Sequence, residues 1–200
     1  LEALKQEKSR NEITEKINDY ITASLGNIKN ATSAYLRYNP ELTPPTSGLF
    51  ISKNPETGEF QNMTPTDLSK YDSSDTEHVG WYYQPTKVGK PTWLLPYQNK
   101  NINVYMISYV VPLTKFDQDI GIIGIDLNFS HIIKFVSSIK VYQTGYAFLE
   151  DENGKIIVHP KLKPGSTLKP KKGYRALRTQ LPNGMSFGIR VPEAEINAER

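Results

Sequence analysis

Two runs of strand-forming residues, separated by a short turn, constrain this chain more than any other feature. Residues 105–113 read YMISYVVPL, and residues 120–127 read IGIIGIDL. β-Branched and aromatic residues of this kind are enriched in strands. The residues FDQD at 116–119 join the two runs, so the sequence predicts an antiparallel hairpin. Gly121 and Gly124 are expected to leave room for a ligand or for a closely packed backbone.

The second run of this hairpin contains one acidic residue, Asp126, between apolar neighbours. A charge in such surroundings is costly unless it is paired. Two interpretations stay open: the carboxylate accepts hydrogen bonds from a ligand ammonium group, or it is a structural acid bonded to the backbone or to a tyrosine. Its place on a strand close to aromatic residues favours the ligand role.

Aromatic residues gather just before the hairpin. The polar residues 72–80, which we expect to form a loop, lead into Trp81 and Tyr82, and Tyr97 follows. Such side chains stack on ligands or enclose cations, although an ordinary aromatic core would give the same pattern. Tyr109 lies on the first strand of the hairpin, with one face directed inward. We therefore predict a small-molecule pocket whose ligand-binding residues are Trp81, Tyr82, Tyr97, Tyr109 and Asp126.

The N-terminal part of the chain has the apolar spacing of a helix. Ile13, Ile17, Ile21, Leu25 and Ile28 follow one another at intervals of four, four, four and three residues, which places them on one helix face. Proline is absent before position 40, so the sequence predicts one long helix over residues 1–38. We expect part of its apolar stripe to pack on the fold and part to pair with another chain in a homodimer; a self-standing coiled coil is the alternative.

A second strand-turn-strand unit follows the hairpin and a helix expected to end near residue 139. Residues 146–149 and 155–158 flank Asn153 and Gly154, a pair that favours a tight hairpin turn. Two further strands are predicted at residues 176–180 and 185–191. The fold class is therefore α+β, with antiparallel sheets in two stacked modules after a long helix. The predicted divisions are 1–40 (helix), 41–130 (first module), 131–192 (second module) and 193–200 (exit helix).

Composition and motifs argue against most kinds of chemistry. The chain contains no cysteine, so disulfides and thiolate sites are excluded. It has neither a Gly-x-Ser-x-Gly elbow nor a phosphate-binding glycine loop, and its three histidines lack metal-ligand spacing. We therefore expect no enzyme activity in this chain, no metal and no cofactor. No run reaches the roughly 18 apolar residues of a membrane span.

The charge of the chain is unevenly distributed. Residues 153–192 hold nine lysines and arginines and no acidic residue, whereas residues 41–130 hold six basic and ten acidic residues. A basic stretch can bind a polyanion, form a solvated face or lie near anionic lipid headgroups. No groove-reading motif accompanies it, so we do not expect nucleic acid as a partner.

Several motifs, in this order and spacing, resemble the double Cache extracellular sensor domain. They are WY at 81–82, KPTW at 90–93, PY at 96–97, SYVVPL at 108–113, IGIIGIDL at 120–127, GYAFL at 145–149 and NGKIIVHP at 153–160. The resemblance covers essentially the whole chain. It implies two PAS-like modules on one long N-terminal helix, placed outside the cell between two transmembrane helices, so that the parent protein is anchored in the membrane on both sides of this domain.

The resemblance also implies a function. Such domains bind small molecules in the membrane-distal module, here residues 41–130, and signal to a cytoplasmic output. Amino-acid-binding members use an arginine two residues before the Trp-Tyr pair, a position that Val79 occupies here. An ordinary amino acid is therefore in doubt as the ligand, and Lys90 is the alternative cation that we consider. Trp81, Tyr82, Tyr97 and Asp126 match the remaining pocket positions.

We therefore expect the extracytoplasmic ligand-sensing domain of a transmembrane signalling receptor, in the first instance a sensor histidine kinase. The expected ligand is a small polar molecule, an amine or an amino-acid-like compound. Two alternatives remain open. One is a dimerisation or interaction module whose pocket is vestigial and which senses a partner protein. The other is the sensor of a chemoreceptor or of a diguanylate cyclase.

Overall fold

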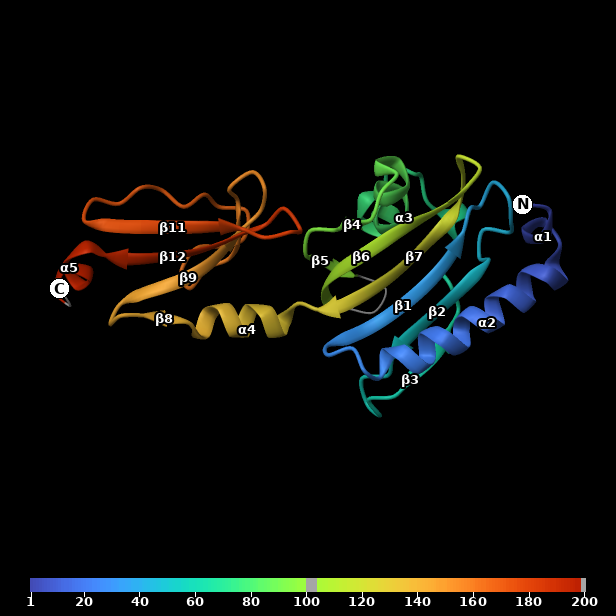
Figure 1. Cartoon of the computed structure of the whole chain (residues 1–200), viewed down its shortest axis with the longest axis horizontal. Coiled ribbons are helices and arrows are strands. Elements are labelled where there is room, and N and C mark those ends of the chain that lie inside the picture. Colours follow the sequence, from blue (N-terminus) through green and yellow to red (C-terminus); the bar gives the residue numbers. More distant parts are fainter. Residues whose placement is uncertain (100–103, 199–200) are drawn as a thin grey trace. The chain divides into compact units, whose positions relative to one another are not determined.

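The computed structural model describes residues 1–99 and 104–198 of the chain. The chain divides into two compact units, Leu1–Asn128 and Phe129–Arg200, which are treated separately below. Both units combine helices with antiparallel sheets (Figure 1), so the predicted α+β class is confirmed. None of the helices within these described residues has both the length and the apolar character needed to cross a membrane.

The first unit is built on one antiparallel sheet. Its strands in the described residues are β1 (Ala31–Tyr38), β2 (Gly48–Lys53), β3 (Phe60–Met63), β4 (Thr92–Trp93), β5 (Tyr97–Asn99), β6 (Val104–Lys115) and β7 (Gln118–Asn128). The order across the sheet is β3-β2-β1-β7-β6-β4, and β5 also pairs with β6. Only Phe116 and Asp117 separate β6 from β7, so the hairpin predicted from the sequence is confirmed.

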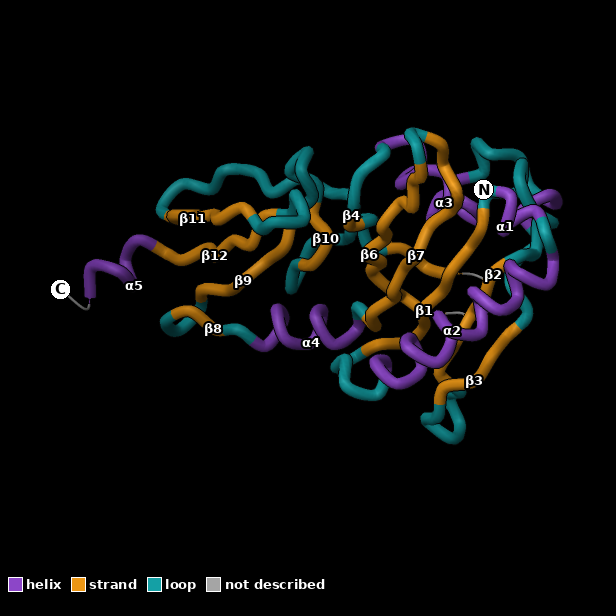
Figure 2. Tube along the Cα trace, turned by 45° about the vertical axis from the view of Figure 1, so that its right-hand side comes forward, coloured by secondary structure: helices purple, strands orange, loops and turns teal. Residues whose placement is uncertain are grey.

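Helices cover both faces of this sheet (Figure 2). They are α1 (Glu2–Lys5), α2 (Glu7–Leu25), the 3-10 helix η1 (Leu68–Lys70) and α3 (Thr76–Val88). Consecutive strand residues point to opposite faces. Accordingly, Ala34 of β1 belongs to the core that contains Leu25 of α2, whereas the next residue, Tyr35, packs with Val79 and Tyr82 of α3. The helices α2 and α3 therefore lie on opposite sides of the sheet.

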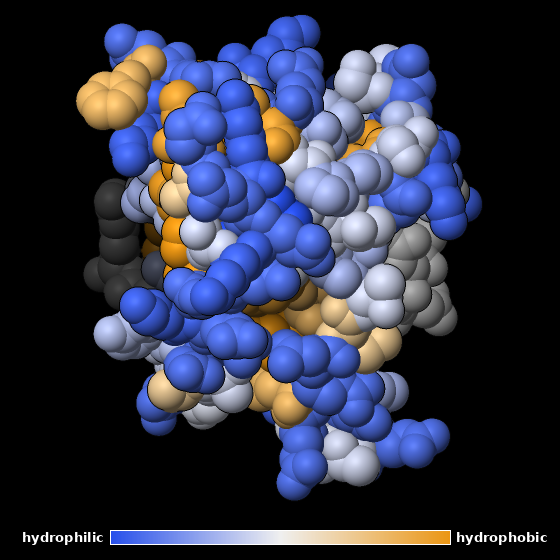
Figure 3. Space-filling view, turned by 90° about the vertical axis from the view of Figure 1, so that its right-hand side faces the viewer, coloured by the Kyte–Doolittle hydropathy of each residue, from blue (hydrophilic) through white to orange (hydrophobic). Residues whose placement is uncertain are grey.

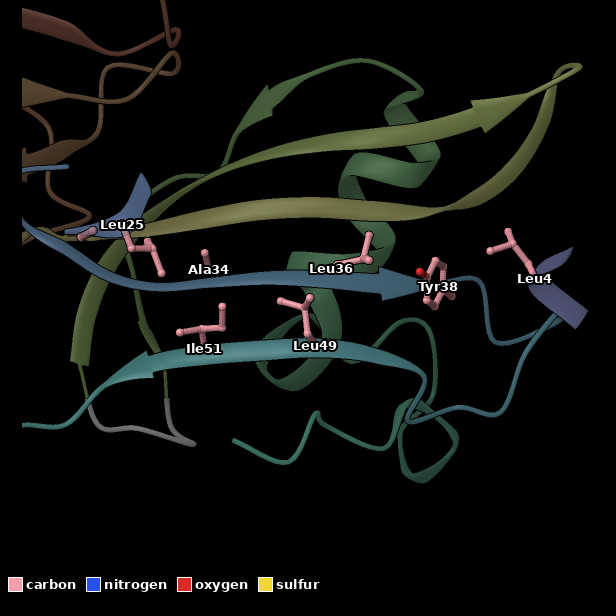
Figure 4. Close-up of a cluster of buried hydrophobic side chains, with 8 residues drawn as sticks. Leu4, Leu25, Ala34, Leu36, Tyr38, Leu49 and Ile51 are labelled. Carbon is pink, nitrogen blue, oxygen red and sulfur yellow. The ribbon is translucent and has the colours of Figure 1, made fainter. Parts of the chain in front are cut away.

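The core on the α2 side joins the N-terminal helices to the central strands (Figure 4). Its buried side chains come from α1, α2, β1 and β2 and include Leu4, Leu25, Ala34, Leu36, Tyr38, Leu49 and Ile51. Burial of apolar surface contributes about 25 cal/mol per Å². This contribution holds α2 against β1 and β2 and fixes which face of β1 is turned away from the helix.

The predicted extent of the N-terminal helix is wrong. The helix α2 ends at Leu25, and residues 31–38 form β1, the strand between β2 and β7. Asn30 begins the change of direction with φ of 65°, a left-handed conformation that asparagine tolerates better than most residues. The sequence of β1 is compatible with a helix, but seven of its eight residues are buried. Tertiary burial on both faces of the strand therefore overrides local propensity.

The outer side of α2 is polar. Glu12, Glu15, Lys16 and Asp19 are exposed along it, and on the side of α1 and α2 the molecular surface is largely hydrophilic (Figure 3). Hydrophobic side chains show there only in limited areas between polar ones. This distribution is typical of a helix with one buried stripe.

The second unit contains a smaller antiparallel sheet. Its elements in the described residues are α4 (Ser130–Ser138), β8 (Lys140–Val141), β9 (Gly145–Glu150), β10 (Ile156–Val158), β11 (Tyr174–Gln180), β12 (Ser186–Pro192) and α5 (Glu193–Ala198). The order across the sheet is β10-β9-β12-β11, with β8 paired to β9. The predicted helix near residues 130–139, the later strands and the helix after residue 193 are confirmed.

The hairpin predicted around Asn153 and Gly154 is also present. Glu150 of β9 pairs with Ile156 of β10, and Gly154 has φ of 72°. The Asp151 side chain accepts hydrogen bonds from the backbone N–H groups of Asn153 and Lys155, at 2.9 and 2.8 Å. The acidic side chain at this tip therefore stabilises the turn.

Gly124 leaves room for an aromatic ring rather than for a ligand. Gly124 of β7 pairs with Tyr35 of β1, and a Cβ atom added at Gly124 would lie 2.4 to 2.5 Å from atoms of the Tyr35 side chain. At Gly121, an added Cβ would lie 2.1 Å from the backbone oxygen of Arg37. The second of the two expectations, a closely packed backbone, therefore applies at Gly121, whereas Gly124 packs against a side chain and fits neither expectation.

We expect Gly124→Ala to destabilise the first unit by about 1–3 kcal/mol, because Tyr35 is buried and its ring cannot move without disturbing the core. Urea unfolding of the purified chain measures this change. Gly26→Ala is the control, since no atom lies within 4 Å of the added Cβ and Gly26 has right-handed helical φ and ψ. Equal stability of the two variants would contradict the packing role of Gly124.

Candidate functional site

A small cavity lies on the α3 side of the sheet in the first unit. Its volume is about 30 Å³, which leaves room for only a few water molecules. The residues that line it come from four strands, from α3 and from the segment before η1: Tyr35, Arg37, Phe50, Thr66, Trp81, Tyr97, Asn99 and Asp126. Strand pairing brings residues from distant parts of the sequence to this one place.

Asp126 lies in a row of polar residues across the sheet. It pairs with Ser33 of β1 on one side and with Ser108 of β6 on the other. The Ser33 hydroxyl donates to one carboxylate oxygen at 2.5 Å, and the Ser108 hydroxyl donates to the other at 2.6 Å. Asp126 is only 2% exposed, and both serines are fully buried. The carboxylate is thus held by two neutral donors and is almost completely buried.

Burial decides the protonation of Asp126. Removal from water raises the pKa of this carboxyl group to about 6, although the hydrogen bonds from Ser108 and Ser33 act in the opposite direction. Desolvation disfavours the charged form, and donors to that form favour it. The Asp126 carboxylate therefore changes charge close to neutral pH.

Two tyrosines extend this polar row into the cavity. The Tyr97 hydroxyl lies 3.0 Å from the Ser108 hydroxyl, and because Ser108 donates its proton to Asp126, Tyr97 donates to Ser108. The buried Tyr35 hydroxyl forms no hydrogen bond of regular geometry in the described residues, although it lies close enough to the Ser108 hydroxyl for that group to lower its pKa in part. Burial and the nearby Asp126 carboxylate raise the pKa of Tyr35 well above its usual value. Tyr35 is thus a neutral donor at the cavity wall.

Trp81 is positioned by the first turns of α3. Asp75 caps the helix by accepting a hydrogen bond from the backbone N–H of His78. The indole N–H of Trp81 donates to the His78 carbonyl at 2.8 Å, and the indole ring meets the Tyr35 ring edge-on, with 5.1 Å between centroids. Trp81 therefore presents its ring to the cavity while its polar N–H is satisfied elsewhere.

The sequence analysis missed Arg37. This residue of β1 is 1% exposed and lines the cavity. Its guanidinium donates to the carbonyl groups of Pro45 and Thr66, at 2.7 Å each, and to that of Ser47 at 3.3 Å. Burial lowers the pKa of Arg37 to about 10, so the group remains charged at neutral pH. Period-two alternation of Ser33, Tyr35 and Arg37 is the sequence signal that would have placed it on this face.

Three of the five predicted ligand-binding residues, Trp81, Tyr97 and Asp126, line the cavity. Tyr82 does not, because it packs in the buried core between α3 and the sheet. Tyr109 does not either, because it follows Ser108 on β6 and points to the opposite face, where it lines a groove beside α2. Lys90 is exposed, so the alternative cation lies outside the cavity as well.

A wider groove adjoins the cavity. Its volume is about 430 Å³, and it runs between α3 and the segment that contains β5. Trp81 and Tyr97 line both the cavity and this groove. These two side chains therefore form the wall between an inner space for small groups and an outer space open to solvent.

We expect the stability of the chain to depend on pH through Asp126. Its folded-state pKa of about 6 exceeds the value near 3.9 of an unfolded chain, so the folded state holds a proton between these values that the unfolded state has lost. Stability should therefore fall by about 2 kcal/mol as the pH rises from 4 to 7. Urea unfolding across this range measures the change.

The Asp126→Asn variant should lack the part of the pH dependence of stability that comes from Asp126. Other titrating groups contribute equally to both proteins, so their contributions cancel when the two unfolding free energies are compared at each pH. A difference in unfolding free energy between them that stays constant from pH 4 to 7 would show that the Asp126 carboxyl is not perturbed by burial.

Comparison with known proteins agrees with this architecture. A family model described as Cache domain matches residues 1–199. The chain is 33% identical over 86 residues to the methyl-accepting chemotaxis protein PctB of Pseudomonas aeruginosa, covering 43% of this chain and 14% of that protein. It spans only 14 to 22% of the length of the first three curated relatives.

Solved structures share the fold. The extracellular domain of a protein described as a histidine kinase, mmHK1S-Z3, has a TM-score of 0.67 at 19% identity, covering 93% of this chain and 82% of that one. The ligand-binding domain of PctB from Pseudomonas aeruginosa, in complex with L-Gln, has a TM-score of 0.62 at 21% identity, covering 100% and 83%. The chain belongs to the Cache domain family, as a double Cache sensor domain.

Proposed function

We propose that this domain senses a small molecule bearing an ammonium group, which binds in the cavity of the first unit. The buried carboxylate of Asp126 carries this proposal. Its two hydrogen bonds come from neutral serine hydroxyls, and no positively charged side chain in the described residues forms a hydrogen bond or ion pair with it. An ionised carboxylate accepts about four hydrogen bonds, which leaves acceptor positions for the N–H groups of a ligand.

The walls of the cavity suit a cation. Trp81, Tyr97, Tyr35 and Phe50 supply aromatic rings around the space, and aromatic faces attract cationic groups, most strongly when water is excluded. An ammonium group placed against Asp126 would therefore gain from both the carboxylate and the rings. A neutral ligand of the same size would leave the charge of Asp126 unbalanced.

The size of the cavity ties binding to a change of conformation. A volume of about 30 Å³ is smaller than most polar metabolites, so a ligand enters only if side chains at the wall move. Trp81 and Tyr97 stand between the cavity and the outer groove, and their displacement would join the two spaces. A ligand shifts an equilibrium between two conformations only by binding one of them more tightly, and this arrangement supplies such a difference.

In the whole protein, we place this domain on the outer side of a cell membrane, as the sensor of a transmembrane signalling receptor. The similarity to chemotaxis proteins and to a histidine-kinase sensor domain supports this assignment. The first unit would be the membrane-distal module and the second unit the membrane-proximal one. We propose a histidine kinase as the first candidate for the cytoplasmic output. A chemoreceptor is the alternative, and the similarity to PctB supports it.

We expect ligand-dependent stabilisation of the purified chain by small amines and amino acids. A compound at one hundred times its dissociation constant should add about 2.7 kcal/mol of stability, which thermal unfolding detects. Asp126→Asn should abolish the response, because it removes the charge while keeping the shape of the side chain. Binding should also strengthen between pH 5 and 7, as the Asp126 carboxylate ionises.

Asp117→Asn is the matched control, because it removes one negative charge from the exposed turn between β6 and β7. It should respond as the unchanged chain does. If Asp126→Asn still responded fully to amines, the cavity would not be the amine site, and a broad panel without any response would contradict ligand sensing by these compounds.

A further inference from the structure

Arg37 is a buried cation that forms no ion pair with an acidic side chain in the described part of the chain. Its neighbours across the sheet are Gly48 of β2 and Ile122 of β7, and in residues 1–99 and 104–198 no salt bridge joins Arg37 to a carboxylate. Asp67 acts on Arg37 only through a longer-range electrostatic attraction and is partly exposed. Removing one partner from a buried charge is costly, so an unpaired arginine at 1% exposure points to a missing anion.

The hydrogen bonds of Arg37 are incomplete in a specific way. Its Nε and Nη2 atoms donate to the carbonyl groups of Ser47, Pro45 and Thr66, which uses three of the five N–H groups of a guanidinium. Among the described residues, the Nη1 atom forms no hydrogen bond, so its two N–H groups are not used by these carbonyl contacts. These carbonyl contacts fix the plane of the guanidinium and leave one amino group for a bound molecule.

Arg37 shares its cavity with Asp126. The two charged residues lie on the same face of the sheet, since Asp126 pairs with Ser33, four residues before Arg37 on β1. At about 3.3 Å per strand residue, Ser33 and Arg37 are about 13 Å apart along the backbone. The side chains of Asp126 and Arg37 therefore approach one cavity from separate positions, with the Tyr35 side chain on the same strand face between them.

Trp81 connects the two ends of this site. The guanidinium carbon of Arg37 lies 5.7 Å from the centre of the Trp81 ring, and the same ring packs against Tyr35. Stacking on an aromatic face orients a guanidinium and leaves its edge free for an anion. The arginine is thus held both by carbonyl groups and by a ring, which is the rigidity that recognition of a planar anion requires.

We propose that Arg37 binds an anionic group, a carboxylate in the first instance, on the same ligand whose ammonium group lies against Asp126. This inference rests on the proposed function and makes it more specific: the cavity selects molecules that carry both charges over simple amines. Val79, the position from which an arginine was expected, is fully buried in the apolar core. The anion site therefore comes from the central strand β1 and not from α3.

Matched ligands test this proposal on the unchanged chain. Isothermal titration would compare the standard amino acids that bind with the corresponding amides and with the amines that lack the carboxylate. Hydrogen bonds to charged groups are stronger than neutral ones, so we expect loss of the carboxylate to weaken binding by about 10- to 100-fold. Loss of the amine from the same molecule should weaken binding as well.

Substitutions of Arg37 then test whether this residue causes the preference for ligands that carry a carboxylate. In Arg37→Gln, the ratio of amino-acid affinity to amine affinity should fall to about 1, whereas Arg37→Lys should keep part of it. Because the ratio is taken within one variant, a general loss of stability affects both ligands and cancels. Arg10→Gln is the control: Arg10 is also a buried arginine bonded to a backbone carbonyl, that of Leu4, but it lies outside the cavity.

The outcomes separate this inference from the proposed function. Amines that bind as tightly as their amino acids, with both responses lost in Asp126→Asn, would overturn the role of Arg37 and leave the amine site standing. A carboxylate preference that persists unchanged in Arg37→Gln would also overturn it. If neither amines nor amino acids bound the unchanged chain, the proposed function itself would fail, and the anion site with it.

Discussion

The buried carboxylate of Asp126 is the constraint on which the first unit depends. An ionised group inside a sheet costs stability, and the two hydroxyls that meet it, from Ser33 and Ser108, reduce this cost without supplying a positive charge. The apolar core around Tyr35, Val110 and neighbouring side chains makes the fold stable enough to tolerate the part of this cost that the hydroxyls do not offset. Natural proteins accept such local costs where a site needs them. The unfavourable free energy of burying the Asp126 carboxylate without a positive charge would be reduced when a cationic ligand binds.

Strands and covering segments contribute differently to the site. The charged and hydrogen-bonding groups Asp126, Ser108 and Arg37 stand on paired strands, whose positions are fixed by backbone hydrogen bonds. The aromatic side chains Trp81 and Tyr97 come from α3, which covers the sheet, and from β5, a three-residue strand that pairs with β6. A change that opens the cavity therefore involves α3 and β5 more easily than the central strands. The polar contacts keep their geometry while the cover moves.

Local sequence patterns predicted the hairpins but not the central strand. The β6–β7 pair follows from β-branched residues around a short turn, and the β9–β10 pair follows from Asn153 and Gly154, so both could be predicted from neighbouring residues. The residues of β1, ATSAYLRY, are compatible with a helix, and their strand conformation depends on pairing with β2 and β7 far along the chain. Because β1 was predicted to be part of a helix, neither Ser33 nor Arg37 was recognised as a residue of the site. The acid of the site was therefore visible in the sequence, whereas its cation was not.

The sequence also identified the aromatic residues near the site, but it did not show which way each side chain points. Consecutive helix residues are separated by about 100°, so only one of Trp81 and Tyr82 faces the cavity, and Ser108 rather than Tyr109 shares the face of Asp126. With these directions known, the cavity holds two buried charges of opposite sign that form no ion pair with each other. If Asp126 and Arg37 served the fold alone, direct pairing would lower the cost of burying both. The proposed ligand, which carries the complementary charges and lies between the two residues, would account for their separation.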